Sequence, residues 1–236
     1  SSKLSADRAV FNTLTIPAPY AGNYTMRIPG QMNDAASPTG DGFGTLTINT
    51  AGLGRLVGTL ADGTKISQGT VVSREGLWPA YVGLYAGKGS LISWLAFTNR
   101  PIDDINGWLS WIKPSDVKAR LYPAGFTNDC MAIGSIYLPL AGRPILNFTR
   151  ATIAFEGQDV FWNSALALGS NNRVTNLSSN RLTMSFSLRT GMFLGNAADA
   201  LSPKSLAFKG VVLQKMNAGS GFLLGTNRSS RVMITP

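Results

Sequence analysis

Hydrophobic and polar residues alternate along much of the chain, as they do in a strand with one buried face. The run from Arg181 to Arg189 alternates without interruption, with leucine, methionine and phenylalanine at its even positions and polar residues at its odd ones. Because successive side chains of a strand point to opposite faces, this run predicts a half-buried antiparallel strand. Residues 45–49 and 205–209 alternate in the same way.

Short turn sequences separate these runs. Asp62-Gly63 lies between two strand-like segments, and this dipeptide is a strong signal for a tight hairpin. Strand candidates recur at intervals of about 8–12 residues, and helical spacing is almost absent. The pattern therefore predicts an all-β, antiparallel fold built as barrels or sandwiches.

The strand candidates fall into two halves on either side of a proline-containing connector. We expect an N-terminal barrel-like or sandwich half at 1–113 and a C-terminal half at 151–236, with about eight strands each. The connector at 114–150 contains four prolines and is expected to hold one or two strands of its own, such as Ile133–Leu138.

A faint internal repeat suggests that the two halves are related. The segment Gly42–Leu46 resembles Gly219–Leu223, and each is followed by an asparagine and then an arginine. Ala21–Tyr24 similarly resembles Thr190–Phe193. Internal duplication would explain both similarities and the central connector, and coincidence in a glycine-rich β protein is the alternative.

The chain has no histidine and a single cysteine, Cys130. These counts exclude Ser-His-Asp and Cys-His catalysis, histidine metal sites, Cys-x-x-Cys metal sites and an internal disulfide. Cys130 lies at the edge of an apolar stretch, so we expect it to be a small buried hydrophobe. We predict a protein that is not an enzyme and that carries no metal and no cofactor.

Carboxylates could form two kinds of functional site, a glycosidase pair or a calcium site, and each has a simpler interpretation. Glu75 and Glu156 could form the paired carboxyl groups of a glycosidase, but nothing in their spacing favours this. Asp103-Asp104, and Asn33-Asp34 with Asp41, could contribute oxygen ligands to calcium. Since no calcium-loop spacing is present, we interpret these residues as turn caps.

The net charge of +9 is unevenly distributed. Residues 1–120 carry eleven basic and eight acidic groups, whereas residues 121–236 carry ten and four, giving +3 and +6. This excess suggests an anionic polymer as partner. The alternative is that the positive charge only keeps the surface solvated. Nucleic acid is disfavoured as a partner because no Lys/Arg-rich run occurs. No membrane-spanning helix is expected, because no apolar run reaches the ~18 residues that such a helix needs.

Aromatic residues are the most informative candidates for a binding site. Planar rings on strands can stack on the faces of sugars, and we select Trp78, Tyr81, Trp108 and Trp111 as carbohydrate-binding residues. Core packing is the competing interpretation for each of them. Trp78 is either an anchor folded over the core or a platform presented to a ligand.

Strand parity divides the remaining tryptophans. Trp108 and Trp111 are three positions apart, so on a regular strand only one of them can point inward. Trp94 shares a face with Ile92, and we expect it in the core.

Several motifs together resemble a β-rich module found toward the C-terminus of very large secreted bacterial proteins, often after immunoglobulin-like domains. The motifs are turn glycines and core aromatics: Gly42–Leu46, Leu60–Thr64, Gly76–Tyr81, Gly87–Ser90 and Tyr122–Phe126. The resemblance implies a secreted or cell-surface location, other domains of a larger parent protein as further candidate partners, and no catalytic residue.

The leading functional hypothesis is a non-catalytic extracellular module that binds a carbohydrate or an anionic cell-surface polymer. The first alternative is a purely structural or adhesive surface domain without a small ligand. The second is a closed barrel whose interior holds an apolar molecule, as eight-stranded barrels can.

Overall fold

The structure is a computed structural model that describes residues 8–32, 34–139, 142–158, 160–198 and 205–236. Its first sheet contains β1 (Gly22–Ile28), β2 (Gly42–Ile48), β3 (Leu53–Thr59), β4 (Lys65–Val71), β5 (Leu77–Leu84), β6 (Gly89–Phe97), β7 (Ile105–Lys113) and β8 (Phe126–Ile136). The second contains β9 (Arg150–Glu156), β10 (Phe161–Leu168), β11 (Val174–Asn176), β12 (Arg181–Ser187), β13 (Met192–Ala198), β14 (Leu206–Leu213), β15 (Ala218–Leu224) and β16 (Ser229–Thr235). Two 3-10 turns, η1 (Tyr85–Gly87) and η2 (Gln214–Met216), are the helical segments of the described residues.

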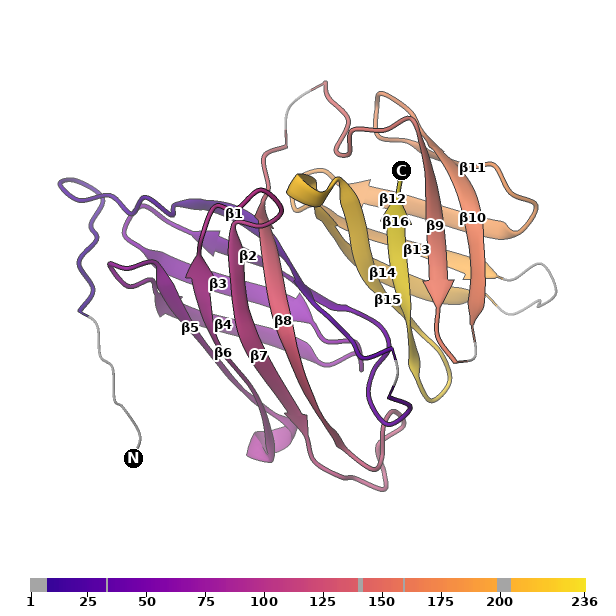
Figure 1. Ribbon diagram of the computed structural model, residues 1–236, viewed down its shortest axis with the longest axis horizontal. Coiled ribbons are helices and arrows are strands. Elements are labelled where there is room, and N and C mark those ends of the chain that lie inside the picture. Colours follow the sequence, from indigo (N-terminus) through magenta and orange to yellow (C-terminus); the bar gives the residue numbers. More distant parts are fainter. Residues whose placement is uncertain (1–7, 33, 140–141, 159, 199–204) are drawn as a thin grey trace.

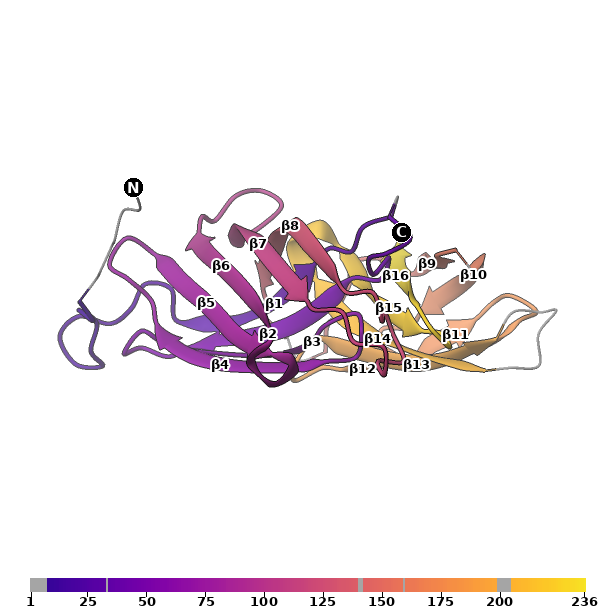
Figure 2. The ribbon, with the colours of Figure 1, turned by 90° about the horizontal axis from the view of Figure 1, so that it is seen from below.

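Both sheets have the same antiparallel connectivity, and the all-β prediction of two related barrel-like halves is confirmed (Figure 1). Each is an eight-stranded meander whose first strand pairs with its last, β1 with β8 and β9 with β16. The first sheet runs in the order β4-β3-β2-β1-β8-β7-β6-β5 and the second in the order β11-β10-β9-β16-β15-β14-β13-β12. In Figure 2, β5, β6 and β7 lie above β2, β3 and β4, so the first sheet curls back on itself.

The local signals in the sequence form the predicted elements. Asp62-Gly63 makes the β3–β4 turn, with Gly63 at φ +90° and the Asp62 carboxylate accepting a hydrogen bond of 2.9 Å from the Thr64 amide. The alternating run at residues 181–189 becomes β12, which has its apolar side chains half-buried and its polar ones exposed. Residues 45–49 and 205–209 lie largely within β2 and β14.

The predicted connector holds one strand, and this strand completes the first sheet. β8 lies within residues 114–150 and pairs with both β1 and β7. The pairing therefore carries the first sheet to Ile136, and the segment between the two sheets runs from Tyr137 to the start of β9. The sequence-based prediction assigned this strand to the connector, because its partner β1 lies about a hundred residues earlier in the chain.

The two segments that resemble each other do not occupy equivalent strands. Gly42–Leu46 lies in β2, the second strand of its sheet, whereas Gly219–Leu223 lies in β15, the seventh strand of the other. The shared connectivity relates the two halves, but this sequence similarity does not follow it. The two segments instead meet at the interface, where the rings of Phe43 and Phe222 lie 5.8 Å apart.

Side chains close the first sheet at the seam between β4 and β5. The Gln68 amide of β4 donates to the Pro79 carbonyl and accepts from the Tyr81 amide, both at 2.9 Å. The Trp78 indole donates to the Thr70 carbonyl at 3.1 Å. Proline has no N–H to donate, so it is confined to strand edges such as this one. The Gln68 side chain takes the place of backbone hydrogen bonds between β4 and β5.

Large side chains fill the interior of the first barrel. Trp78 and Trp111 are buried there with Met26, Leu46 and Leu91. The Trp111 indole donates at 3.0 Å to the Tyr85 hydroxyl, which in turn donates to Asp62 at 2.7 Å. Both buried indole N–H groups are thus satisfied, as buried tryptophans require.

A buried carboxylate joins the two barrels. Asp41, just before β2, is wholly buried, and its oxygens lie 2.8 Å from Nε of Arg27 on β1 and 3.3 Å from Nε of Arg231 on β16. The Ser220 hydroxyl donates to it at 2.6 Å and the Gly30 amide at 3.0 Å. Asp41 is therefore neither the calcium ligand nor the turn cap that the sequence suggested. Groups from both barrels compensate its charge.

Further polar contacts cross the same interface. The Thr25 hydroxyl of β1 donates to the Val212 carbonyl of β14 at 2.5 Å. The Tyr122 hydroxyl lies 3.0 Å from the Ser229 hydroxyl and accepts a hydrogen bond of 2.8 Å from the Ser229 amide. These groups are buried. Separating the barrels would break each of these hydrogen bonds, so the contacts favour the observed arrangement.

Trp78→Ala should destabilise the protein by about 3–5 kcal/mol, because it removes a wholly buried indole and leaves a cavity. Urea unfolding followed by fluorescence measures this change. Trp108→Ala is the matched control: its indole is 68% exposed, so its unfolding free energy should stay within about 0.5 kcal/mol of the parent protein. Equal losses in the two variants would contradict the anchor role of Trp78.

Asp41→Asn should lower the free energy of unfolding by about 3–5 kcal/mol, because it preserves shape but leaves two arginines without their buried counter-charge. Urea is the suitable denaturant because it does not screen charge. The control is Asp129→Asn, which removes an exposed carboxylate and should be nearly neutral. An Asp41→Asn variant as stable as the control would show that the ion pairs contribute little.

Candidate functional site

The four aromatic residues predicted to stack on a ligand divide into two buried and two exposed. Trp78 and Trp111 are 0% and 1% exposed, whereas Tyr81 and Trp108 are 63% and 68% exposed. A wholly buried ring cannot offer its face to a ligand, so Trp78 and Trp111 are corrected to core residues. Tyr81 and Trp108 remain candidates.

Strand parity explains this division. Within β7, Trp111 points inward with Leu109, and Trp108 points outward, as the odd spacing predicts. In β5, Trp78 points inward with Ala80, so Tyr81 points outward. Gly54 on β3 makes room for the inward indole, since a Cβ at Gly54 would collide with the Trp78 ring.

The expectation that Trp94 lies in the core is wrong. Trp94 does share a face with Ile92, but that face is the outer one, and the two side chains are 52% and 44% exposed. Leu91, Ser93 and Leu95 point inward instead. Both faces of β6 are apolar, so alternation gave the correct pairing of residues but no means of deciding which set was inside.

Register brings the exposed rings together on the outside of β5, β6 and β7. Pro79 lies opposite Trp94, and Tyr81 opposite Ile92. The β6–β7 register, with Ser93 opposite Leu109, sets Trp94 opposite Trp108. Directly opposed residues have Cβ atoms about 4.5–5.5 Å apart and diagonal ones about 7–8 Å. We call the surface formed by Tyr81, Trp94 and Trp108 the aromatic face.

The aromatic face is continuous with other apolar side chains. Trp108 lies opposite Met131 of β8, which is 39% exposed, and Ile92 and Ile112 are exposed on the neighbouring strands. The outward positions of β5, β6 and β7 carry no charged residue: Leu77, Pro79, Tyr81, Gly83, Ser90, Ile92, Trp94, Ala96, Asn106, Trp108, Ser110 and Ile112. The outer positions of β5, β6 and β7 are therefore uncharged in a protein of net charge +9, and the exposed Asp129 borders them on β8, opposite Ser110.

A small hollow borders the aromatic face at the β4–β5 seam. It has a volume of about 180 Å³, and Trp94, Pro79 and Leu77 line it on one side, with Ser73 and Arg8 contributing polar groups. Apolar walls with a few polar groups are typical of small-molecule sites, although this hollow is smaller than most of them.

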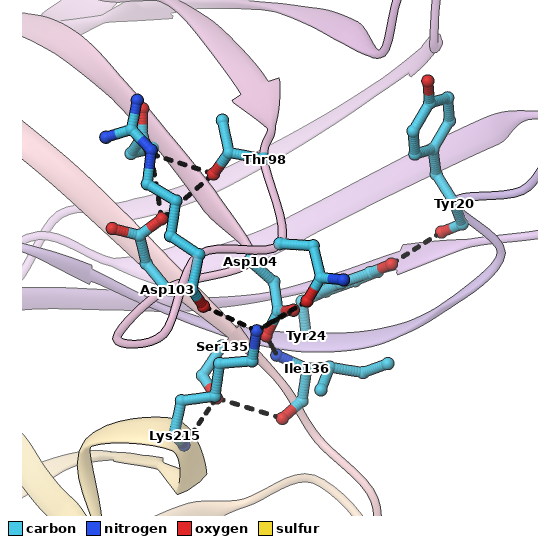
Figure 3. Close-up of polar contacts among 11 residues, drawn as sticks. Tyr20, Tyr24, Thr98, Asp103, Asp104, Ser135, Ile136 and Lys215 are labelled. Carbon is cyan, nitrogen blue, oxygen red and sulfur yellow. Dashed lines mark hydrogen bonds and ion pairs between the residues drawn. The ribbon is translucent and has the colours of Figure 1, made fainter.

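Asp104, considered above with Asp103 as a calcium ligand, forms an ion pair with a lysine instead (Figure 3). Lys215, on η2 of the second barrel, places its ammonium 2.7 Å from Asp104 and donates to Asn99 and to the Arg100 carbonyl at 2.8 Å each. The ammonium thus occupies a site rich in oxygen atoms.

Asp103 completes this cluster from within the first barrel. It accepts hydrogen bonds from the Thr98 hydroxyl at 3.0 Å and the Asn106 amide at 2.9 Å. Burial, and secondly the negative charge of Asp104, raise the pKa of the nearby Tyr24 hydroxyl to about 12. The cluster therefore stabilises the contact between barrels. Among the described residues, no three Asp, Glu, Cys or His side chains gather as a metal site.

The two glutamates belong to different barrels. Glu75 is exposed in the turn before β5, and Glu156 ends β9. Their separate positions give no facing pair of carboxyl groups. Asn33, also considered as an oxygen ligand, lies outside the described residues.

The fold and its surface together define a class: a two-barrel all-β protein with a neutral aromatic face on its first barrel. No family model matches the chain, and no curated protein matches it. Among solved structures it is similar to a protein of unknown function from Nostoc punctiforme, of the DUF3598 family. The sequences are 11% identical over 91% of this chain and 94% of that one, with a TM-score of 0.20. A likeness at this level says nothing about function.

No helix in the described part of the chain could span a lipid bilayer.

Cys130 should resist thiol reagents in the folded protein. It is buried on β8, and burial, followed by the charges of Asp41 and Asp129, raises the pKa of its thiol from 9.0 to about 12. The reactive thiolate is therefore scarce at pH 8. Reaction with an aromatic disulfide reagent at that pH should be slow in buffer and complete in urea. Fast labelling of the native protein would contradict this environment.

Proposed function

We propose that this protein is a non-catalytic module that binds a neutral polysaccharide through the aromatic face. The observation that carries the proposal is the co-location of Tyr81, Trp94 and Trp108 on one side of the first barrel, each more than half exposed. Sugar rings present C–H groups on their faces, and these complement the negative faces of aromatic rings.

The rigid support of the three rings favours a role in ligand binding. The three rings stand on paired strands rather than on loops, so little conformational freedom is lost when a ligand orders them. Folded proteins seldom expose adjacent large apolar groups without a use, because such a patch favours association. A series of rings on adjacent strands suits an extended chain with a repeating ring structure.

The absence of charge on the aromatic face favours a neutral chain over an anionic one. The outward positions of β5, β6 and β7 are all uncharged, while the net charge of +9 arises elsewhere. Contacts of this kind are insensitive to screening, whereas contacts between exposed charges weaken once separation exceeds about 8–10 Å at physiological salt.

A ligand inside the first barrel is a weaker alternative. Its interior is filled by Trp78, Trp111, Leu46 and other large side chains, so an apolar molecule would have to displace well-packed groups. A secreted or cell-surface location, as part of a larger protein, suits polysaccharide binding, and we propose it on the resemblance of the glycine and aromatic motifs.

Trp94→Ala and Trp108→Ala should each weaken polysaccharide binding about tenfold or more, since a central ring commonly contributes at least ~2 kcal/mol. The measurement is depletion onto cellulose, chitin, xylan and starch, followed by calorimetry with soluble oligosaccharides of any that bind. Affinity should change little between 50 mM and 500 mM salt. Tyr81→Ala should have a smaller effect.

Phe161→Ala provides the matched control. Phe161 is 83% exposed on β10 of the second barrel, away from the aromatic face, and its removal should leave affinity unchanged. Equal losses in all variants, or no binding to any neutral polysaccharide, would contradict the proposal. Sedimentation of the parent and the Trp108→Ala variant adds a second check: a dimer that dissociates in the variant would assign the face to self-association.

A further inference from the structure

A second candidate site lies in a cleft between the two barrels. Its volume is about 550 Å³, within the ~300–1,000 Å³ range of ligand sites. The first barrel contributes β1, β2 and β3, and the second contributes the turn between β12 and β13. We call it the inter-barrel cleft; it shares no lining residue with the aromatic face. It is lined by Asn23, Tyr24, Thr45, Thr47, Arg55, Val57, Tyr137, Arg189 and Thr190.

Register aligns polar side chains along one wall of the inter-barrel cleft. Asn23 on β1 lies opposite Thr47 on β2, and Thr47 lies opposite Arg55 on β3. The Thr47 hydroxyl donates to Asn23 Oδ1 at 3.0 Å, which leaves the Asn23 amide N–H groups to face a ligand. Thr45 follows Thr47 on the same face of β2. The wall therefore presents hydrogen-bond donors at Asn23, Thr45 and Arg55, and the Thr47 hydroxyl as an acceptor.

Specific contacts hold the opposite wall in place. Tyr137 donates from its hydroxyl to the Leu188 carbonyl at 2.5 Å, and the Gly191 amide donates to the Ser187 carbonyl at 2.9 Å. A Cβ at Gly191 would collide with the Tyr137 ring, so glycine permits this close approach. The anchored turn brings Arg189 and Thr190 to the cleft.

The charges of the inter-barrel cleft are of one sign. Arg55 and Arg189 are exposed, and neither has an ion-pair partner among the residues that the structure describes. No aspartate or glutamate lines the cleft. Guanidinium groups recognise carboxylates and sulfates through paired N–H donors. Two of them, one from each barrel, face a common volume with no competing acid.

We propose that the inter-barrel cleft binds an acidic oligosaccharide, with Arg55 and Arg189 holding its carboxylate or sulfate groups. The volume greatly exceeds that of a free inorganic anion, and Thr45, Thr47, Thr190 and Asn23 provide partners for sugar hydroxyls. Nucleic acid fits less well, because single strands rely on stacking against exposed aromatic rings. The two rings here, Tyr24 and Tyr137, are only 6% and 2% exposed.

Arg55→Gln and Arg189→Gln should each weaken binding of an acidic oligosaccharide about tenfold, since each loses a charge-assisted bidentate contact. The probes are an oligogalacturonate and a sulfated oligosaccharide of similar length, measured by calorimetry at 50 mM and 300 mM salt. Their relative affinities distinguish carboxylate from sulfate recognition. Affinity should fall with added salt, in contrast to binding at the aromatic face.

Arg120→Gln is the matched control, because it removes the same charge from an exposed position outside the cleft. Its affinity should remain close to that of the parent, and all three variants should unfold at the same urea concentration. Equal losses at residues 55, 189 and 120, no binding of either acidic probe, or tighter binding of a single-stranded oligonucleotide would overturn the proposal. Trp108→Ala should leave this binding intact, which separates the test from that of the aromatic face.

Discussion

The arrangement of the two barrels depends on one buried carboxylate. Asp41 has no solvent exposure, and arginines from both barrels approach it, Arg27 from β1 and Arg231 from β16. A buried charge is tolerated only when opposite charges and hydrogen-bond donors surround it, and here those groups come from both barrels. Moving the barrels apart would remove Arg231 and the Ser220 hydroxyl from the carboxylate and leave Arg27 as its ion-pair partner. The interface is therefore specified by charge as well as by packing.

This constraint extends to the periphery of the interface. Lys215 crosses from η2 to the loop that contains Asp104, and Tyr137 holds the turn before β13. Both contacts need the relative position that Asp41 and its partners establish. The inter-barrel cleft is a consequence of the same geometry, because Arg55 and Arg189 approach a common volume only while the barrels keep their orientation.

The aromatic face has a different physical basis, since it lies within one barrel. Strand pairing fixes Trp94 opposite Trp108, and the closed interior prevents either ring from turning inward, because Trp78 and Trp111 already occupy the space. The seam at Gln68 keeps β5 joined to β4 although Pro79 interrupts the ladder. The proposed neutral site and the proposed anionic site thus rest on separate elements, which allows each to be tested alone.

Sequence by itself determined the local features, because alternation and turn chemistry act over a few residues. It predicted the all-β class, the Asp62-Gly63 hairpin, the strand at residues 181–189, of which 181–187 form β12, and the opposite orientations of Trp108 and Trp111. Tertiary structure decided which apolar face is inside when both are apolar, as for Trp94, and which distant strand β8 completes. It also decided that Asp41 and Asp104 hold cations from the other barrel. The two ion pairs and the pairing of β8 with β1 depend on partners about one hundred to nearly two hundred residues away, and a local pattern carries no information about them.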